Sequence, residues 1–264
     1  MDKADNLTVV ILTKNEEKDI VKAIKNAQRL TEKVLIVDSG STDKTVALSK
    51  EKGAEVVYRE WDNDFAAQRN FALQHVTTEW VLYLDADERM NNELIADISS
   101  KLHQDKKAQY RIIRRNSAFG RDFRYGVLGP DSVMRLFPTK GVKWEGKVHE
   151  RPVSEFQEAI LNGYLKHYTY ASFDEYMEKM NKYASIGAMD RKQKGKKCSV
   201  INDLVLRPAF AFFKMYILKL GILEGWLGFV LCLNYANYTL NKYGKLKMLW
   251  EKQNAKIINN STSL

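Results

Sequence analysis

Two carboxylates, Asp85 and Asp87, stand one residue apart at the end of the apolar run Trp80-Val-Leu-Tyr-Leu84, with the small Ala86 between them. In an extended chain, residues two positions apart point to the same side, so both carboxylates can face one ligand. Paired carboxylates suit a hard divalent cation, and such a cation can bridge to a diphosphate. An isolated Asp-x-Asp is more often a solvated turn, so the surrounding elements must decide between the two interpretations.

A third acid, Asp38, follows the apolar run Lys33-Val-Leu-Ile-Val37 and precedes Ser39-Gly-Ser41. An acid at such a position can accept hydrogen bonds from a ribose hydroxyl or a base N–H. The glycine pattern of dinucleotide-binding and triphosphate-binding loops is missing after the first apolar run, where Thr13-Lys-Asn-Glu16 stands instead. Binding of NAD and Walker-type binding of ATP are therefore disfavoured.

A His-Glu pair, His149 and Glu150, offers a base for a group transfer. An inverting transfer needs a base that removes a hydroxyl proton while the leaving group departs from the opposite face, and a carboxylate can serve. A lone His-Glu is usually a surface pair, so Asp131 and Glu145 remain alternative bases. Arg135 can offset the negative charge of a leaving group, or it can be an ordinary solvated cation.

The apolar spacing predicts strands that alternate with helices over about the first 90 residues. The strands are expected at 7–12, 33–37, 54–58 and 80–84, and the helices at 20–27, 45–52 and 65–75. This order predicts a doubly wound, Rossmann-like, mainly parallel sheet, whose ligands bind beyond the carboxyl ends of the strands. Asp38 and Asp85 both fall on that edge. Residues 108–137 predict an antiparallel extension with a flexible Gly-rich loop at 119–129.

Four motifs in this chain resemble those of the family 2 glycosyltransferases of the GT-A fold, and the resemblance runs from Leu7 to about Arg151. The motifs are Val9-Val-Ile-Leu-Thr-Lys-Asn-Glu16, Val37-Asp-Ser-Gly-Ser-Thr-Asp43, Ala67-Gln-Arg-Asn70 and Leu82-Tyr-Leu-Asp-Ala-Asp-Glu88. With Trp144-Glu-Gly-Lys-Val-His-Glu150 and an aromatic C-terminal region, the chain is similar to the bacterial subgroup that adds glucose to lipopolysaccharide core.

The resemblance implies roles for individual residues of this chain. Residues that bind the donor would be Thr13 and Glu16 in the nucleotide pocket, Asp38 at the uracil or ribose, Arg69 near the base, and Asp85 at the ribose or at metal-bound water. Asp87 would ligate a divalent metal, Mg²⁺ or Mn²⁺, and His149 would approach the metal or the diphosphate. Glu150 stands 63 residues after Asp87, where the family places its acidic base.

We therefore expect a metal-dependent, inverting transfer of a sugar, with glucose favoured, from a UDP-sugar to a cell-surface glycan or glycolipid acceptor such as lipopolysaccharide core. Within this class, transfer to a lipid phosphate or a teichoic-type polymer is an alternative. A nucleotidyltransferase is a second alternative, although no Gly-rich triphosphate loop is visible near the N-terminus. A catalytically inactive nucleotide-sugar binding module is a third, which the intact acids disfavour.

The net charge of +9 is unevenly distributed along the 264 residues. Residues 1–170 contain 27 Lys and Arg against 26 Asp and Glu, whereas residues 171–264 contain 15 against 7. We expect a GT-A catalytic domain over 1–170, with a nucleotide-sugar half at about 1–105 and an acceptor half at about 106–170. A basic, aromatic-rich helical region is expected over 171–264.

A neutral body with a basic, apolar end favours an anionic membrane surface rather than nucleic acid as partner. Gly225 to Asn241 is uncharged but short and contains asparagines, so helices lying in the membrane interface are expected rather than a span. A buried helical subdomain or a homo-oligomer interface is the alternative. The acidic residues among the first six and the two widely spaced cysteines predict a cytoplasmic protein, peripheral on the inner face of the membrane.

Overall fold

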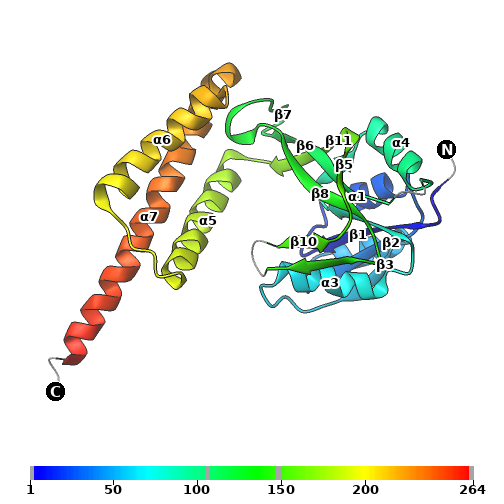
Figure 1. Ribbon diagram of the computed structural model, residues 1–264, viewed down its shortest axis with the longest axis horizontal. Helices are drawn as coiled ribbons and strands as arrows, with labels where there is room; N and C mark the ends of the chain where they lie inside the picture. The colour runs from blue at the N-terminus through cyan, green and yellow to red at the C-terminus, as the bar shows by residue number, and fades with distance from the viewer. Residues whose placement is uncertain (1–2, 105–106, 147–149, 262–264) are drawn as a thin grey trace. The chain divides into compact units, whose positions relative to one another are not determined.

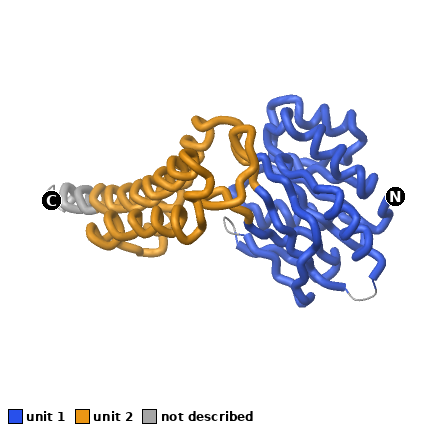
Figure 2. Tube along the Cα trace, turned by 90° about the horizontal axis from the view of Figure 1, so that it is seen from above, with its two compact units in different colours: residues 1–115, 131–168 blue, residues 116–130, 169–264 orange. Residues whose placement is uncertain are grey.

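The computed structural model describes residues 3–104, 107–146 and 150–261. The chain divides into two compact units (Figure 2). Unit 1 comprises residues 1–115 and 131–168, and unit 2 comprises residues 116–130 and 169–264.

Unit 1 is built on a mixed sheet in the order β3-β2-β1-β4-β8-β6-β11-β5. The first four positions in this order are parallel strands, and β8 joins them antiparallel to β4. The strands are β1 (Leu7–Thr13), β2 (Val34–Asp38), β3 (Glu55–Tyr58), β4 (Trp80–Asp85), β5 (Glu88–Met90), β6 (Gln109–Ala118), β8 (Asp131–Pro138) and β11 (Glu158–Tyr170). A separate antiparallel pair is formed by β9 (Val142–Glu145) and β10 (Arg151–Ser154). The predicted doubly wound, mainly parallel GT-A architecture is confirmed.

Helices cover both faces of this sheet (Figure 1). Alternate residues of β1 and β4 enter two different cores: Val9 and Leu82 pack with α1 (Ile20–Ala27) and α4 (Asn92–Lys101), whereas Val10 and Val81 pack with α3 (Phe65–His75). Strands that are buried on both faces read as continuous apolar runs, which is why the sequence predicted them well. The remaining helix of unit 1 is α2 (Thr45–Glu51).

The strand register brings the predicted acids to one edge of the sheet. Thr13 at the end of β1 pairs with Asp38 at the end of β2. Leu12 of the same strand pairs with Asp85 at the end of β4. The carboxyl ends of three neighbouring parallel strands therefore present Thr13, Asp38 and Asp85 together, as the strand pattern predicted for Asp38 and Asp85.

Unit 2 consists mainly of helices. They are η1 (Gly126–Leu128), α5 (Phe173–Gln193), a helical run made of η2 (Val200–Leu206), α6 (Arg207–Phe213) and η3 (Lys214–Leu218), then η4 (Gly221–Glu224) and α7 (Gly225–Ser261). The run from 200 to 218 contains two π-helical stretches, η2 and η3. The short strand β7 (Arg121–Asp122) pairs with the end of β6. A helical C-terminal region, as predicted, is present.

The segment 116–130 belongs to unit 2, whereas the predicted division of the chain placed it with the sheet. The buried carboxylate of Glu224 accepts hydrogen bonds from the backbone N–H groups of Arg124 (2.8 Å) and Tyr125 (3.0 Å). Phe123 and Leu128 pack in the same core cluster as residues of α5 and α7. The expected loop at 119–129 is thus held by helices that lie about 50 to 100 residues later in the chain.

None of the described helices is long and apolar enough to cross a membrane alone. Two helical stretches, Val200–Leu218 and Gly221–Gln253, are together long and apolar enough to cross a membrane, judged by length and composition only. A bend of 71° separates them.

Gly163 of β11 lies where β11 packs closely against the start of α4, so a substitution at this glycine tests the packing. Its φ is +86°, and an added Cβ would lie 2.3 Å from the Leu94 nitrogen and 2.6 Å from Oδ1 of Asn91. We expect Gly163→Ala to lower the free energy of unfolding by about 3 kcal/mol, because backbone strain adds to the overlap. Gly53→Ala is the control: its φ is +77° with no atom within 4 Å, so about 1 kcal/mol is expected. Equal losses in urea unfolding would contradict the packing argument.

Candidate functional site

The carboxylate of Asp38 is 3% exposed and is surrounded by donors from its own loop. Its Oδ2 accepts from the N–H groups of Gly40 and Ser41, both at 2.9 Å. Its Oδ1 accepts from the hydroxyl groups of Thr13 (3.2 Å) and Ser41. These four hydrogen bonds fix the shape of the turn at the ends of β1 and β2. The expected contact between Asp38 and uracil or ribose stays a prediction.

The loop after β1 is fastened to the loop after β2. Asn15 has a φ of 59°, and its Oδ1 accepts from the Thr42 N–H at 2.8 Å. The Asn15 N–H donates to the Ser41 hydroxyl (2.8 Å), and the Glu16 N–H donates to the Thr45 hydroxyl (2.7 Å). Glu16 is therefore held next to the Asp38 turn with its side chain half-buried, which agrees with a place in the donor pocket but does not test it.

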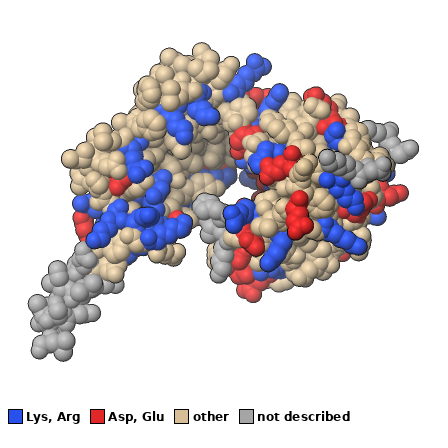
Figure 3. Space-filling view, viewed as in Figure 1, with Lys and Arg blue, Asp and Glu red and all other residues tan. Residues whose placement is uncertain are grey.

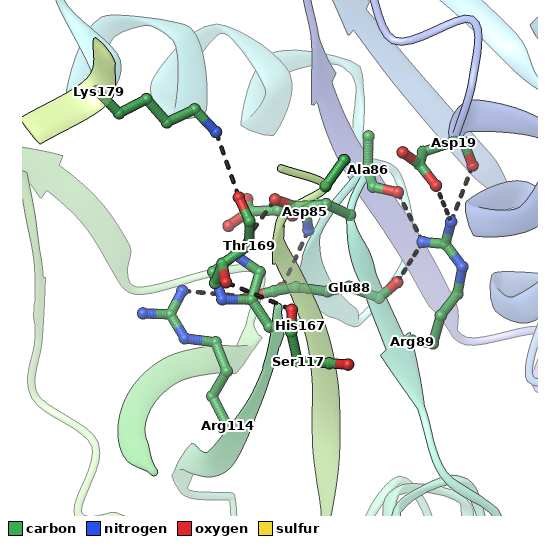
Figure 4. Close-up of polar contacts among 12 residues, drawn as sticks. Asp19, Asp85, Ala86, Glu88, Arg89, Arg114, Ser117, His167, Thr169 and Lys179 are labelled. Atoms are coloured by element: carbon green, nitrogen blue, oxygen red, sulfur yellow. Dashed lines mark hydrogen bonds and ion pairs between the residues drawn. The ribbon is translucent and has the colours of Figure 1, made fainter. Parts of the chain in front are cut away.

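A buried charge network lies beneath Asp85. Arg135, 4% exposed, contacts both carboxylate oxygens of Asp85 and donates to Oε1 of Glu88 at 2.7 Å. Arg114 approaches the same Oε1 at 3.4 Å (Figure 4). Glu88 is fully buried, and its Oε2 accepts from the Asp85 N–H at 3.1 Å. Glu88 and Arg114, which the sequence analysis did not single out, thus set the position of Asp85.

The network also sets the charge of its members. Burial by itself would raise the pKa of Asp85, but the guanidinium groups of Arg135 and then Arg69 outweigh it and lower the pKa to about 2. Burial lowers the pKa of Arg135, and the adjacent Asp85 and Glu88 more than reverse this, so its pKa is raised. Two carboxylates therefore balance the charge that we expected Arg135 to offer to a leaving group, and its position is that of a buried organising cation.

Arg89 closes the turn that contains Asp85 and Asp87. Its guanidinium donates to the carbonyl oxygens of Ala86 (2.6 Å) and Glu88 (2.7 Å), and to the carbonyl oxygen of Asp19 at 3.0 Å (Figure 4). Arg89 therefore fixes the backbone of this turn and ties it to the residue that precedes α1.

Asp87, just before β5, contacts His167 of the neighbouring strand β11. Its Oδ2 lies 3.2 Å from Nε2 of His167, and its carbonyl accepts from the Tyr168 N–H at 2.9 Å. This contact follows from the antiparallel pairing of β5 with β11, which aligns His167 with Glu88. The predicted partner, His149, lies outside the described residues. Within the described ranges, no group of three or more His, Cys, Asp or Glu side chains is placed to hold a metal ion.

Arg69 joins the strand-end acids to the predicted base. Its Nη2 lies 3.5 Å from Oε1 of Glu150 and 4.0 Å from Oδ1 of Asp85. The guanidinium lies over the rings of Trp144 (4.7 Å) and Tyr83 (5.0 Å). In the described part of the chain, the buried Nε of Arg69 and Nε1 of Trp144 have no hydrogen-bond partner. Arg69 therefore approaches Glu150 through Nη2, while its Nε is buried against the two rings.

The two alternative bases are placed differently. Both oxygens of Asp131 accept from Arg114, at 2.9 and 2.7 Å. Glu145 is exposed and faces Lys143 at 3.9 Å. A carboxylate in a two-pronged pair with arginine has its lone pairs engaged. The geometry therefore disfavours Asp131, and the choice of Glu150 over Glu145 stays a prediction.

Residues 8–152 match the family model of glycosyl transferase family 2. The lipopolysaccharide core biosynthesis glycosyltransferase LpsC of Rhizobium meliloti (strain 1021) is 30% identical over 257 residues, covering 91% of each chain. An uncharacterized glycosyltransferase of Rickettsia typhi is 30% identical over 92% of this chain and 87% of its own. Among solved structures, glucosyl-3-phosphoglycerate synthase from Mycobacterium tuberculosis with Mn²⁺ and UDP-glucose matches with a TM-score of 0.45 and 17% identity, over 74% of this chain and 80% of that one.

The chain therefore belongs to glycosyl transferase family 2 and is a nucleotide-sugar glycosyltransferase. The family predicted from the four motifs is confirmed. The likeness to LpsC agrees with the predicted resemblance to enzymes of lipopolysaccharide core synthesis.

The charge network predicts the effect of removing its central carboxylate. Glu88→Gln keeps the volume but leaves Arg135 and Arg114 with less negative charge in a buried site. We expect the free energy of unfolding to fall by about 3 kcal/mol, as for other broken buried pairs. Asp131→Asn removes a half-exposed partner of Arg114 and should cost less than about 1 kcal/mol. Urea unfolding of both variants checks this, and a larger loss for Asp131→Asn would contradict it.

Proposed function

We propose that this chain transfers a sugar, with glucose favoured, from UDP to a hydroxyl group of a cell-surface glycan such as lipopolysaccharide core, with inversion at the sugar carbon. Family membership and the likeness to LpsC over 91% of both chains support the reaction class and the acceptor. The observation that carries the proposal is Arg69, whose guanidinium faces both Asp85 on the donor side and Glu150, the proposed base.

The donor would bind at the carboxyl edge of β1, β2 and β4. The interlocked loops that hold Thr13, Glu16 and Asp38 would enclose the nucleoside, and Asp85, about a third exposed, would face it from the end of β4. Arg69, whose Nη2 lies 4.0 Å from Oδ1 of Asp85, would lie near the base of the UDP-sugar. Arg135 would act indirectly by holding Asp85.

Asp87 and His167 would hold a divalent ion. Oδ2 of Asp87 and Nε2 of His167 are 3.2 Å apart, and this pair of one oxygen and one nitrogen donor would suit a divalent ion. Mg²⁺ prefers oxygen ligands alone, so the mixed set favours Mn²⁺. When bound, the ion supplies positive charge that stabilises the departing diphosphate. The role expected for His149, near the metal or the diphosphate, stays a prediction, and His167 is proposed as a ligand in its own right.

Glu150 would act as the base. Its carboxylate would take the proton of the acceptor hydroxyl, the hydroxyl oxygen would bond to the anomeric carbon, and the bond from that carbon to the UDP oxygen would break with its electron pair going to UDP. Arg69 would hold Glu150 in place through its contact with Oε1 at 3.5 Å, and this contact would leave Oε2 of Glu150 to accept the proton. A single displacement inverts the configuration of the sugar carbon.

We further propose that the basic helical region associates with the anionic inner face of the membrane. Its excess of Lys and Arg supports this, as do many large apolar side chains that unit 2 leaves exposed. Attraction to anionic lipid and burial of apolar area both favour such an interface. A homo-oligomer formed through the same side chains is the competing outcome, and light scattering would reveal it.

The proposed metal pair predicts a metal-dependent affinity for UDP. We expect Asp87→Asn and His167→Gln to weaken UDP binding in Mn²⁺ by 10-fold or more, because each removes one ligand of the ion. His103→Gln, a change at an exposed histidine of unit 1, is the control and should bind UDP normally. Titration calorimetry with Mn²⁺ and with excess chelator checks this. Equal UDP affinity in the two conditions would refute the metal-bridged donor.

The proposed base predicts a loss of rate without a loss of donor affinity. Glu150→Gln keeps the shape but cannot take a proton, so UDP release from UDP-glucose should fall by about 10²- to 10⁴-fold while UDP affinity stays unchanged. Asp131→Asn should keep the rate within a few-fold. The reverse pattern would make Asp131 the base. If the wild-type protein binds UDP but releases none from any UDP-sugar of a panel, the transfer reaction itself is wrong.

A further inference from the structure

Unit 2 contains a basic pocket of about 450 Å³, and none of the residues proposed above for the sugar transfer lines it. It is lined by α5, by the helical run from 200 to 218 and by α7. Its walls carry four cations, which come from α5, α6, η3 and α7: Arg191, Arg207, Lys214 and Lys242. Figure 3 shows basic side chains gathered over the helices of this unit.

Three of these cations surround one buried ring. Tyr243 of α7 is 4% exposed. The charged group of Arg191 lies 4.9 Å from the ring centroid, and those of Arg207 and Lys242 each lie 5.4 Å from it. Interaction with an aromatic ring offsets part of the repulsion between cations, but it does not neutralise them. The ring therefore holds three positive charges close together.

One carboxylate near the pocket, that of Asp203, balances one of these positive charges. Asp203 pairs with Arg207 at 2.5 Å and also accepts from the Ser199 N–H at 2.8 Å. Within residues 150–253, the other three cations have no ion pair with a carboxylate. Burial lowers the pKa of Lys242, and the neighbouring Arg191 and Arg207 lower it further. Such a surplus of convergent cations suits an anion with several oxygens, as a phosphate group has.

An exposed apolar stripe borders the pocket on the helical run. Its members recur at intervals of three and four residues and are 43 to 59% exposed: Leu206, Phe210, Phe213 and Ile217. Residues at this spacing share one face of a helix. Leu206 and Phe210 also line the pocket itself. A soluble phosphate would make no use of the stripe, whereas a lipid offers a phosphate and hydrocarbon in the same molecule.

We propose that this pocket binds the phosphate group of an anionic membrane lipid, with the apolar stripe entering the boundary between headgroups and acyl chains. The inference rests on the membrane association proposed above and names its site. It is independent of the sugar transfer, which uses residues of unit 1.

The test compares two variants that lose the same charge. Lys214→Gln with Lys242→Gln empties the pocket of two cations, and Lys182→Gln with Lys252→Gln removes two exposed lysines of α5 and α7 that do not line it. Partition of each full-length protein is measured by flotation at 0.15 M salt with phosphatidylcholine vesicles containing phosphatidylglycerol, and with pure phosphatidylcholine vesicles. Thermal unfolding confirms that both variants fold.

We expect the pocket variant to lose about 10-fold in partition to phosphatidylglycerol vesicles and the control less than about 3-fold, with little change on phosphatidylcholine. Equal losses would overturn the proposal, because charge alone would then explain binding. Inorganic phosphate that stabilises the wild type but not the pocket variant, with no vesicle binding, would also overturn it in favour of a soluble ligand. UDP binding by the wild type without vesicles tests the proposed transfer separately.

Discussion

The buried carboxylate of Glu88 is the constraint on which the candidate site depends. A fully buried carboxylate is costly unless cations and N–H donors satisfy it. Here Arg135 and Arg114 supply the cations, and the Asp85 N–H supplies the donor. Because Arg135 also binds the side chain of Asp85, one network fixes both the backbone and the carboxylate of that residue. The end of β4 therefore has a defined shape before any ligand arrives.

The same constraint separates the roles of the two acids in the Asp-x-Asp motif. Asp85 points into the arginine network, which occupies its oxygens. Asp87 contacts the imidazole of His167 instead, and for this reason we propose Asp87 rather than Asp85 as the metal ligand. The sequence analysis expected both acids in an extended chain, but β4 ends at Asp85 and Asp87 lies in the turn before β5, so the two carboxylates have different neighbours. The motif alone treats the two carboxylates as alike.

The sequence predicted the part of the site that parallel strands bring together. Asp38 and Asp85 end adjacent runs of buried residues, so their proximity followed from local patterns. His167 was missed because its contact with Asp87 depends on antiparallel pairing between strands 80 residues apart, and no local pattern encodes that pairing. Glu88 was missed because an acid in a polar turn resembles a solvated residue. The placement of 116–130 with the helices likewise depends on the distant Glu224.

The low pKa of Asp85 bears on how the site responds to acid. A carboxyl whose pKa is about 2 when folded, below its ordinary value of 3.8, contributes stability above about pH 4, and this contribution is lost as the pH falls toward 2. Across ordinary pH, the lowered pKa of Asp85 and the raised pKa of Arg135 keep this pair of side chains charged. Any pH dependence of the proposed sugar transfer near neutrality would then come from groups other than Asp85 and Arg135. A rigid charged scaffold thus leaves the reacting groups to set the pH response.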